Sequence, residues 1–174
     1  MSNSSLATKE KKSIALTSVF AAIFLTGFKL VIGILTGSLG ILSEALHSAL
    51  DLVAAIITFF AVKFADVPPD EGHNYGHGKI ENYSALIETL LLVITCIWII
   101  YEGIRRLVTH EVQIEVTVWS FIVIVSSIVI EFSRSRALYR VAKKHDSQAL
   151  EADALHFSTD IFSSSVVLIG LIGA

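Results

Sequence analysis

The stretch SEALHSALDLVAAIITFF, residues 43–60, is almost entirely apolar, yet it contains His47 and Asp51 four positions apart. Four residues make about one turn of an α-helix, so both side chains point to the same face. Ionisable residues are costly inside a membrane and are generally retained there for a function. The stretch therefore predicts a membrane-spanning helix that carries a functional pair of imidazole and carboxylate.

The composition of the whole chain is that of a membrane protein. Its 174 residues are 53% hydrophobic and have a mean hydropathy of +0.70, with long apolar runs between short charged stretches. The formal net charge of −3, with scattered lysines and arginines, gives no support for a nucleic-acid partner. The single cysteine, Cys96, excludes a disulfide framework and a zinc knuckle built on cysteines.

The apolar runs predict an all-α fold, a polytopic bundle of five transmembrane helices. Each run has roughly 20 residues or more, which is enough to cross about 30 Å of hydrocarbon. After a cytoplasmic N-terminal segment at 1–12, the transmembrane domain at 13–174 is expected to contain helices at 13–35, 39–64, 83–107, 116–139 and 149–174. The final apolar run has no polar tail, which indicates a fragment of a longer chain.

Basic residues predict the orientation in the membrane, because cytoplasmic loops carry an excess of lysine and arginine. The end of the bundle that contains the N-terminus has most of them: Lys9, Lys11, Lys12, Lys63, Lys79, Arg134, Arg136, Arg140, Lys143 and Lys144. Only Arg105 and Arg106 are assigned to the opposite side. We therefore expect a cytoplasmic N-terminus and a location in the inner (cytoplasmic) membrane. Lys29, inside the first helix, either snorkels to an interface or pairs with an acid.

A second pair with the same spacing occurs in the fifth helix. In EADALHFSTD, residues 151–160, His156 and Asp160 follow an Ala-Leu dipeptide, as His47 and Asp51 do in the second helix. The second and fifth helices cross in opposite directions, which is the pattern of an inverted repeat with a binding site near the midplane. A rise of about 1.5 Å per residue places each histidine level with the aspartate of the other helix.

Two imidazoles and two carboxylates at one point suit a divalent metal in tetrahedral geometry, zinc first. The charges of two carboxylates and one divalent ion sum to zero. Without the ion, two buried negative charges would take up protons, so metal and protons compete for the same groups. The structural alternative is that each pair only forms hydrogen bonds between helices.

The loop between the second and third helices has further potential ligands. In ADVPPDEGHNYGHGKIEN, residues 65–82, Asp70, His73 and His77 lie close together among glycines that would let the backbone wrap around an ion. The prolines at 68–69 end the preceding helix. The alternative is a polar turn whose histidines have no function.

Three segments together, SEALHSALD (43–51), PPDEGHNYGHGK (68–79) and ALEADALHFSTDIFSS (149–164), resemble the cation diffusion facilitator family of proton-coupled divalent metal exporters. The resemblance implies a homodimer, and a sixth helix and C-terminal cytosolic domain that are absent from this chain. It implies a transport site and, as in some bacterial members, a second metal site on the cytoplasmic side. The transport site consists of His47, Asp51, His156 and Asp160, and the second site of Asp70, His73 and His77.

The preferred function is therefore that of a secondary transporter, not an enzyme. It would export Zn²⁺ from the cytoplasm in exchange for protons. In this family a histidine at position 47 favours zinc and cadmium over manganese, and iron remains an alternative. Two other classes stay open: a non-transporting membrane bundle that binds or senses metal, and an intramembrane zinc hydrolase. The hydrolase is disfavoured because HExxH is missing and four ligands would close the site.

Overall fold

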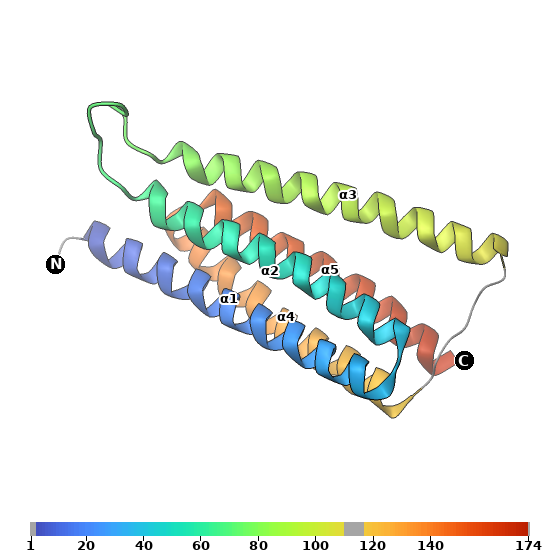
Figure 1. The fold of residues 1–174 in the computed structure, drawn as a ribbon. Coiled ribbons are helices and arrows are strands. Elements are labelled where there is room, and N and C mark those ends of the chain that lie inside the picture. The colour runs from blue at the N-terminus through green and yellow to red at the C-terminus, as the bar shows by residue number, and fades with distance from the viewer. Residues whose placement is uncertain (1–2, 110–116, 174) are drawn as a thin grey trace.

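The computed structural model describes residues 3–109 and 117–173, which form five α-helices and, within those ranges, no strands (Figure 1). α1, α2, α4 and α5 run side by side, and α3 packs against α2 and α5. The predicted all-α bundle of five helices is thus confirmed. Their bounds are α1 (Asn3–Thr36), α2 (Leu39–Ala65), α3 (Lys79–Thr109), α4 (Val118–His145) and α5 (Gln148–Gly173).

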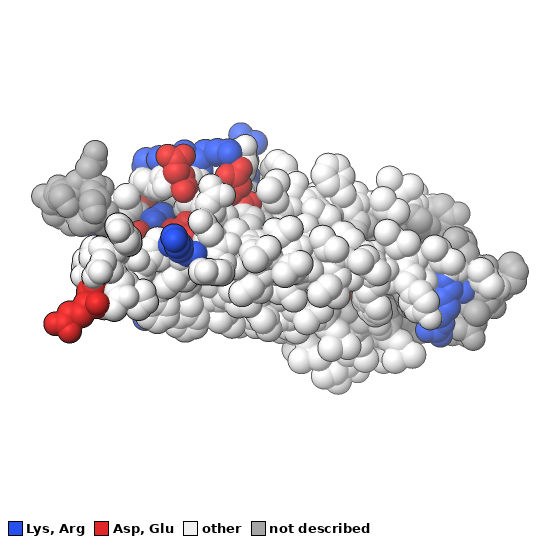
Figure 2. All heavy atoms as spheres, turned by 90° about the horizontal axis from the view of Figure 1, so that it is seen from above, with Lys and Arg blue, Asp and Glu red and all other residues white. Residues whose placement is uncertain are grey.

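Four of these helices are long and apolar enough to span a bilayer, in the stretches Leu6–Thr36, Leu39–Ala65, Lys79–Tyr101 and Val118–His145. Figure 2 shows a broad belt of uncharged atoms on one face, with charged side chains gathered towards its ends. These features define a multi-pass membrane protein. α5, which carries several acidic residues, is not one of the four candidate spans found in the described residues. Its crossing of the membrane therefore stays a prediction.

The helices extend further than the apolar runs that predicted the membrane spans, and the division into an N-terminal segment and a transmembrane domain stays a prediction. The segment at 1–12 is already helical from Asn3, α3 begins at Lys79 and α4 continues to His145. Ion pairs between polar helix ends support the additional turns, which an apolar run cannot reveal. They join Lys144 Nζ to Glu10 Oε2 and Lys143 Nζ to Glu151 Oε1, both at 2.6 Å. Residues 116 and 174, predicted as helix ends, lie outside the described residues.

Short turns hold α1 against α2 and α4 against α5. Gly37 has a φ of 69°, a conformation that glycine adopts without strain, and Ser38 caps α2 by accepting a hydrogen bond from the backbone N–H of Ile41. Asp146 ends α4 with a φ of 49°, a left-handed conformation that aspartate tolerates better than most residues. Both helix pairs are therefore antiparallel hairpins.

The two hairpins meet in a core of small and medium apolar side chains. Ala15 of α1, Ala61 and Val62 of α2, Leu138 of α4 and Phe157 of α5 are all buried there. Small side chains let helix backbones approach closely, which is how helices associate inside membranes. This packing brings α2 and α5, the two helices with His–Asp pairs, into contact.

A buried lysine ties the helices together at the end of the bundle that contains the N-terminus. Lys11 Nζ of α1 lies 2.8 Å from Asp66 Oδ1 at the end of α2 and 3.0 Å from Glu81 Oε1 in α3. The hydroxyl of Ser147, between α4 and α5, donates to the other oxygen of Glu81 at 2.5 Å. One polar cluster thus contacts every helix or its adjoining turn, which fixes the relative heights of the two hairpins.

The close contact of α1 with α2 generates a prediction about stability. A Cβ atom at Gly33 would lie 2.8 Å from Leu42 Cδ2 and 3.2 Å from the Leu42 backbone nitrogen, whereas one at Gly27 would meet nothing within 4 Å. We expect Gly33→Val to lower the free energy of unfolding by about 1–3 kcal/mol through overpacking. Thermal unfolding in detergent measures it, with Gly27→Val in the same helix as the control. Equal unfolding temperatures for the two variants would contradict the contact.

Candidate metal centre

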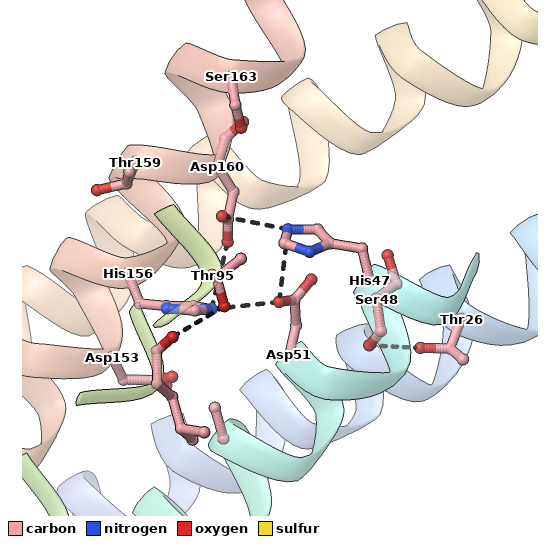
Figure 3. A network of polar contacts seen from close by, with 12 residues as sticks. Thr26, His47, Ser48, Asp51, Thr95, Asp153, His156, Thr159, Asp160 and Ser163 are labelled. Carbon is pink, nitrogen blue, oxygen red and sulfur yellow. Dashed lines mark hydrogen bonds and ion pairs between the residues drawn. The ribbon is translucent and has the colours of Figure 1, made fainter. Parts of the chain in front are cut away.

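The structure brings the two His–Asp pairs together at the contact between α2 and α5. α2 presents His47 and Asp51, and α5 presents His156 and Asp160, so that the four side chains point towards one another (Figure 3). On each helix the spacing of four residues puts the imidazole and the carboxylate on the same face. Both pairs need the antiparallel packing of the two hairpins to meet.

Each histidine contacts the aspartate of the other helix as well as its own. Between helices, His156 Nε2 lies 3.2 Å from Asp51 Oδ1, and His47 Nε2 lies 3.5 Å from Asp160 Oδ1. Within helices, the corresponding distances are 3.5 Å for His156 and Asp160 and 3.9 Å for His47 and Asp51. The four groups therefore form a closed ring in which imidazoles and carboxylates alternate.

These distances suit a bound metal ion. A tetrahedral ion with bonds of about 2.0–2.2 Å keeps its donor atoms about 3.3–3.6 Å apart. The contacts between donors in the ring span 3.2–3.9 Å, and the ligand atoms of His47, Asp51 and Asp160 all lie within 4.8 Å of one another. His156 contacts Asp51 and Asp160 but is not within this distance of all three residues, so a tetrahedral site with four donors needs its imidazole to move closer to the other ligands. That these residues bind metal stays a prediction.

The centre is buried, but unevenly. Asp51, His156 and Asp160 are each about 5% exposed or less, whereas the side chain of His47 is 20% exposed. Burial removes most of the hydration of both carboxylates, so they need positive charge or protons nearby. The imidazoles in contact with the carboxylates can supply a proton or share a cation with them.

Buried charged residues surround the centre, and the sequence pattern did not assign most of them a place. Lys29 is 1% exposed and pairs with Glu44 at 3.3 Å, which resolves its two alternatives in favour of an acid partner. Arg134, predicted among the basic residues at the cytoplasmic end, is 7% exposed and covers the ring of Phe157. Glu131, also buried, lies three positions before Arg134 in α4, and the apolar runs and the repeated His–Asp spacing do not single it out.

The loop residues predicted as a second site also lie together. Asp70 Oδ1 is 3.0 Å from His73 Nδ1, Asp70 Oδ2 is 3.5 Å from His77 Nε2, and the two imidazole rings are 4.2 Å apart. Gly76, with a φ of 77°, provides the tight turn between the histidines. The three side chains could hold a metal ion by their spacing alone, and Asp70 and His73 are exposed to solvent.

Hydrogen bonds to Asp70 favour its ionised form. The side chain of His73 holds the pKa of the Asp70 carboxyl below its usual range, and the backbone N–H groups of His73 and Gly72 lower this pKa further. The carboxylate is therefore available as a ligand, or as a partner for a protonated histidine, at neutral pH.

A multi-pass helical bundle with a His–Asp ring in its interior defines a class of membrane protein built around a buried polar centre. Comparison with protein families then shows which one. The model of the family described as "Cation efflux transmembrane domain" matches residues 15–174. The chain belongs to this cation efflux family, as its motifs predicted.

Individual relatives agree with this assignment. An uncharacterized transporter of Methanocaldococcus jannaschii is 36% identical over 94% of this chain and 58% of its own length. The cation-efflux pump FieF of Shewanella oneidensis is 32% identical over 89% of this chain and 52% of its own length. The chain thus spans about half the length of the curated relatives it matches.

The separation of the loop cluster from the centre in the bundle generates a second prediction. We expect His73→Ala to weaken zinc binding by the loop more than about tenfold, because even the loss of an outer-shell partner costs about 10–100-fold in affinity. Binding at the intramembrane residues should persist. Isothermal titration of the purified chain with zinc measures both sites, with Asn74→Ala in the same loop as the control. Loss of all zinc binding in His73→Ala would contradict two separable sites.

Proposed function

We propose that this chain forms the ion-translocating part of a secondary transporter that exports divalent metal, zinc foremost, from the cytoplasm in exchange for protons. The observation that carries the proposal is the alternating ring of His47, Asp51, His156 and Asp160 inside the bundle. Cadmium and iron are the alternative ions. The FieF relatives are named cation-efflux pumps, which supports export as the direction of transport.

Charge explains why the ring suits metal in exchange for protons. Two carboxylates and one divalent ion are neutral together, and neutrality favours burial in an apolar bundle. When the ion leaves, the carboxylates and imidazoles regain neutrality by binding protons. Because metal and protons need the same lone pairs, occupancy by one excludes the other. A bundle that opens this ring alternately to the two sides would couple the two flows.

The two other functions remain weaker. A metal sensor would use the same ring without moving the ion across the membrane, so only transport measurements separate it from the exporter. A zinc hydrolase needs an open coordination position for water. Four protein donors would close a tetrahedral site and leave no position for water, which disfavours hydrolysis.

We propose that the protein lies in the inner membrane of the cell, with its N-terminus in the cytoplasm. The end of the bundle that contains the N-terminus also contains the Asp70 loop and the turn between α4 and α5 (Figure 1). Lysines at this end, including Lys143 and Lys144, are exposed to solvent, in accord with the excess of positive charge on the cytoplasmic side. The homodimer implied by the family resemblance also stays a prediction.

The carboxylates of the ring provide the direct test. We expect Asp51→Asn and Asp160→Asn each to reduce zinc flux into vesicles by more than about 100-fold, because each variant removes an anionic ligand and leaves the loaded site with a buried positive charge. A zinc dye and a pH dye inside the same vesicles should report opposite movements of metal and protons in the unmodified chain.

Asp146→Asn is the matched control, because it makes the same exchange at an exposed residue whose left-handed conformation asparagine also adopts. It should transport normally. Normal flux in either ring variant would refute the transport site. Zinc binding without flux in the unmodified chain would favour the sensor.

The choice of metal generates a further prediction. His47→Asp replaces a neutral nitrogen donor by an anionic oxygen, so the loaded ring changes from neutral to a net charge of −1 and becomes a harder site. We expect the preference for zinc over manganese to fall by roughly tenfold. Competition between the metals for binding to the purified chain measures it, and Gln148→Glu, which adds one negative charge at an exposed position outside both metal sites, is the control. An unchanged ranking would show that His47 does not determine selectivity.

A further inference from the structure

Both histidines of the ring have an acidic residue three positions earlier in the same helix. Glu44 precedes His47, and Asp153 precedes His156. Residues three apart are neighbours on a helix surface, and a helical side chain leans over the turn that precedes it. Each acid is therefore beside the ring of its histidine, on the side away from the proposed ion. Of the two, Asp153 is fully buried, whereas Glu44 is partly exposed and pairs with Lys29.

Asp153 is fixed by contacts with two other helices. Its Oδ2 accepts a hydrogen bond from Ser18 Oγ of α1 at 3.4 Å, and Ser18 Oγ accepts one from Arg134 Nη2 of α4 at 2.9 Å. The guanidinium carbon of Arg134 lies 3.7 Å from the centre of the Phe157 ring, which in turn meets His156 edge to face with 5.5 Å between centroids. These residues form a shell behind His156.

Three buried atoms at this place lack hydrogen-bond partners. They are Nδ1 of His156, Oδ1 of Asp153 and Nε of Arg134. Buried polar atoms are nearly always paired, so each exception needs an explanation. Figure 3 shows Nδ1 of His156 turned away from Asp51 and Asp160, while Nε2 faces them.

The position of the ring proton decides whether Nδ1 of His156 and Oδ1 of Asp153 can pair. Nε2 of His156 faces Asp51 and Asp160, the other proposed ligands. When the single proton of a neutral imidazole is on Nε2, Nδ1 is a bare acceptor. The carboxylate oxygen of Asp153 is an acceptor too, and two acceptors cannot pair.

Metal binding reverses this situation. An ion bound at Nε2 takes the lone pair there, so the proton of the neutral ring must be on Nδ1. Histidine ligands of metals nearly always donate this second N–H to a carboxylate, a carbonyl or water. The free oxygen of Asp153 is one helical turn away and accepts no hydrogen bond from the residues that the structure describes. The proton leaves Nε2 and the ring regains one at Nδ1, so its charge is unchanged.

We propose that Asp153 is the outer-shell partner of the metal centre, and that it accepts a hydrogen bond from Nδ1–H of His156 when the ion occupies Nε2. The inference rests on the proposed metal site and adds to it a positioning residue outside the ring. It makes the two halves of the site unequal: His156 gains a buried carboxylate partner, whereas the corresponding carboxylate at His47 is paired with Lys29.

A double-mutant cycle tests the coupling. Zinc affinity of the purified chain in nanodiscs is measured by competition with a chelator. We expect Asp153→Asn to weaken binding about 10–100-fold, the cost of losing an outer-shell partner. The loss of zinc affinity caused by Asp153→Asn should persist when it is combined with His47→Asp. Combined with His156→Asp, the same change should weaken binding by less than about threefold. Both backgrounds keep four ligands and the same added charge, but only the second lacks an Nδ1–H.

The outcomes distinguish the proposed role of Asp153 from the proposed metal site itself. Equal losses in the two backgrounds, or no loss from Asp153→Asn alone, would overturn the role of Asp153, because a general charge effect does not depend on which histidine is present. Unchanged zinc affinity in Asp51→Asn would instead overturn the metal site itself. Glu44→Gln is the matched control, with an expected effect below about threefold because Lys29 already occupies its carboxylate.

A measurement on the unmodified chain keeps the test valid if Asp153→Asn does not fold. With ¹⁵N-labelled histidine, zinc should convert one ring to the tautomer with a protonated Nδ1 and a metal-bound Nε2. The ring is assigned to His156 by its disappearance in His156→Asp. A zinc-bound His156 with its proton on Nε2 would overturn the proposal.

Discussion

Two carboxylates with little access to water are the constraint on which this structure depends. Asp51 and Asp160 lie inside a bundle whose outer surface is apolar, and neither has a lysine or arginine among its contacts within hydrogen-bond distance in the described residues. Both are instead in contact with imidazoles. Because imidazole is a weak base and a good metal ligand, it can neutralise the carboxylates by a proton or share a metal ion with them. A permanent cation could not be exchanged in this way.

The buried lysines and the buried arginine of the bundle lie outside the ring of histidines and aspartates. Lys29 pairs with Glu44, and Lys11 with Asp66 and Glu81, while Arg134 is directed to Ser18 and to the face of Phe157. Glu88 accepts hydrogen bonds from the hydroxyls of Thr58 and Ser84, and within the described residues it has no cation among its hydrogen-bond partners. Ion pairs of lysine with acidic residues thus hold the helices together outside the ring. Within the ring, the contacts are between histidine and aspartate, which can exchange a proton or an ion.

Much of this could be predicted from the sequence because the apolar runs are long and the His–Asp spacing occurs twice. When two antiparallel helices carry the same spacing of four residues, the histidine of one helix lies level with the aspartate of the other. The contacts of His47 with Asp160 and of His156 with Asp51 illustrate this. The helix ends and the burial of Arg134 could not be predicted. They depend on partners in other helices, and a pattern within one segment contains no information on those partners.

The distance along the chain between the two halves of the ring affects how the protein is made. Asp51 and His156, which touch in the folded bundle, are 105 positions apart. Chains are synthesised from the N-terminus, so α2 reaches the membrane before α5 exists. An aspartate at the centre of a helix costs about 2.5–3.5 kcal/mol on insertion, and each leucine, isoleucine, valine or phenylalanine contributes only about −0.3 to −0.6 kcal/mol. The dense aliphatic and aromatic residues that follow Asp51, in LVAAIITFF, thus let α2 insert while its polar pair still lacks partners.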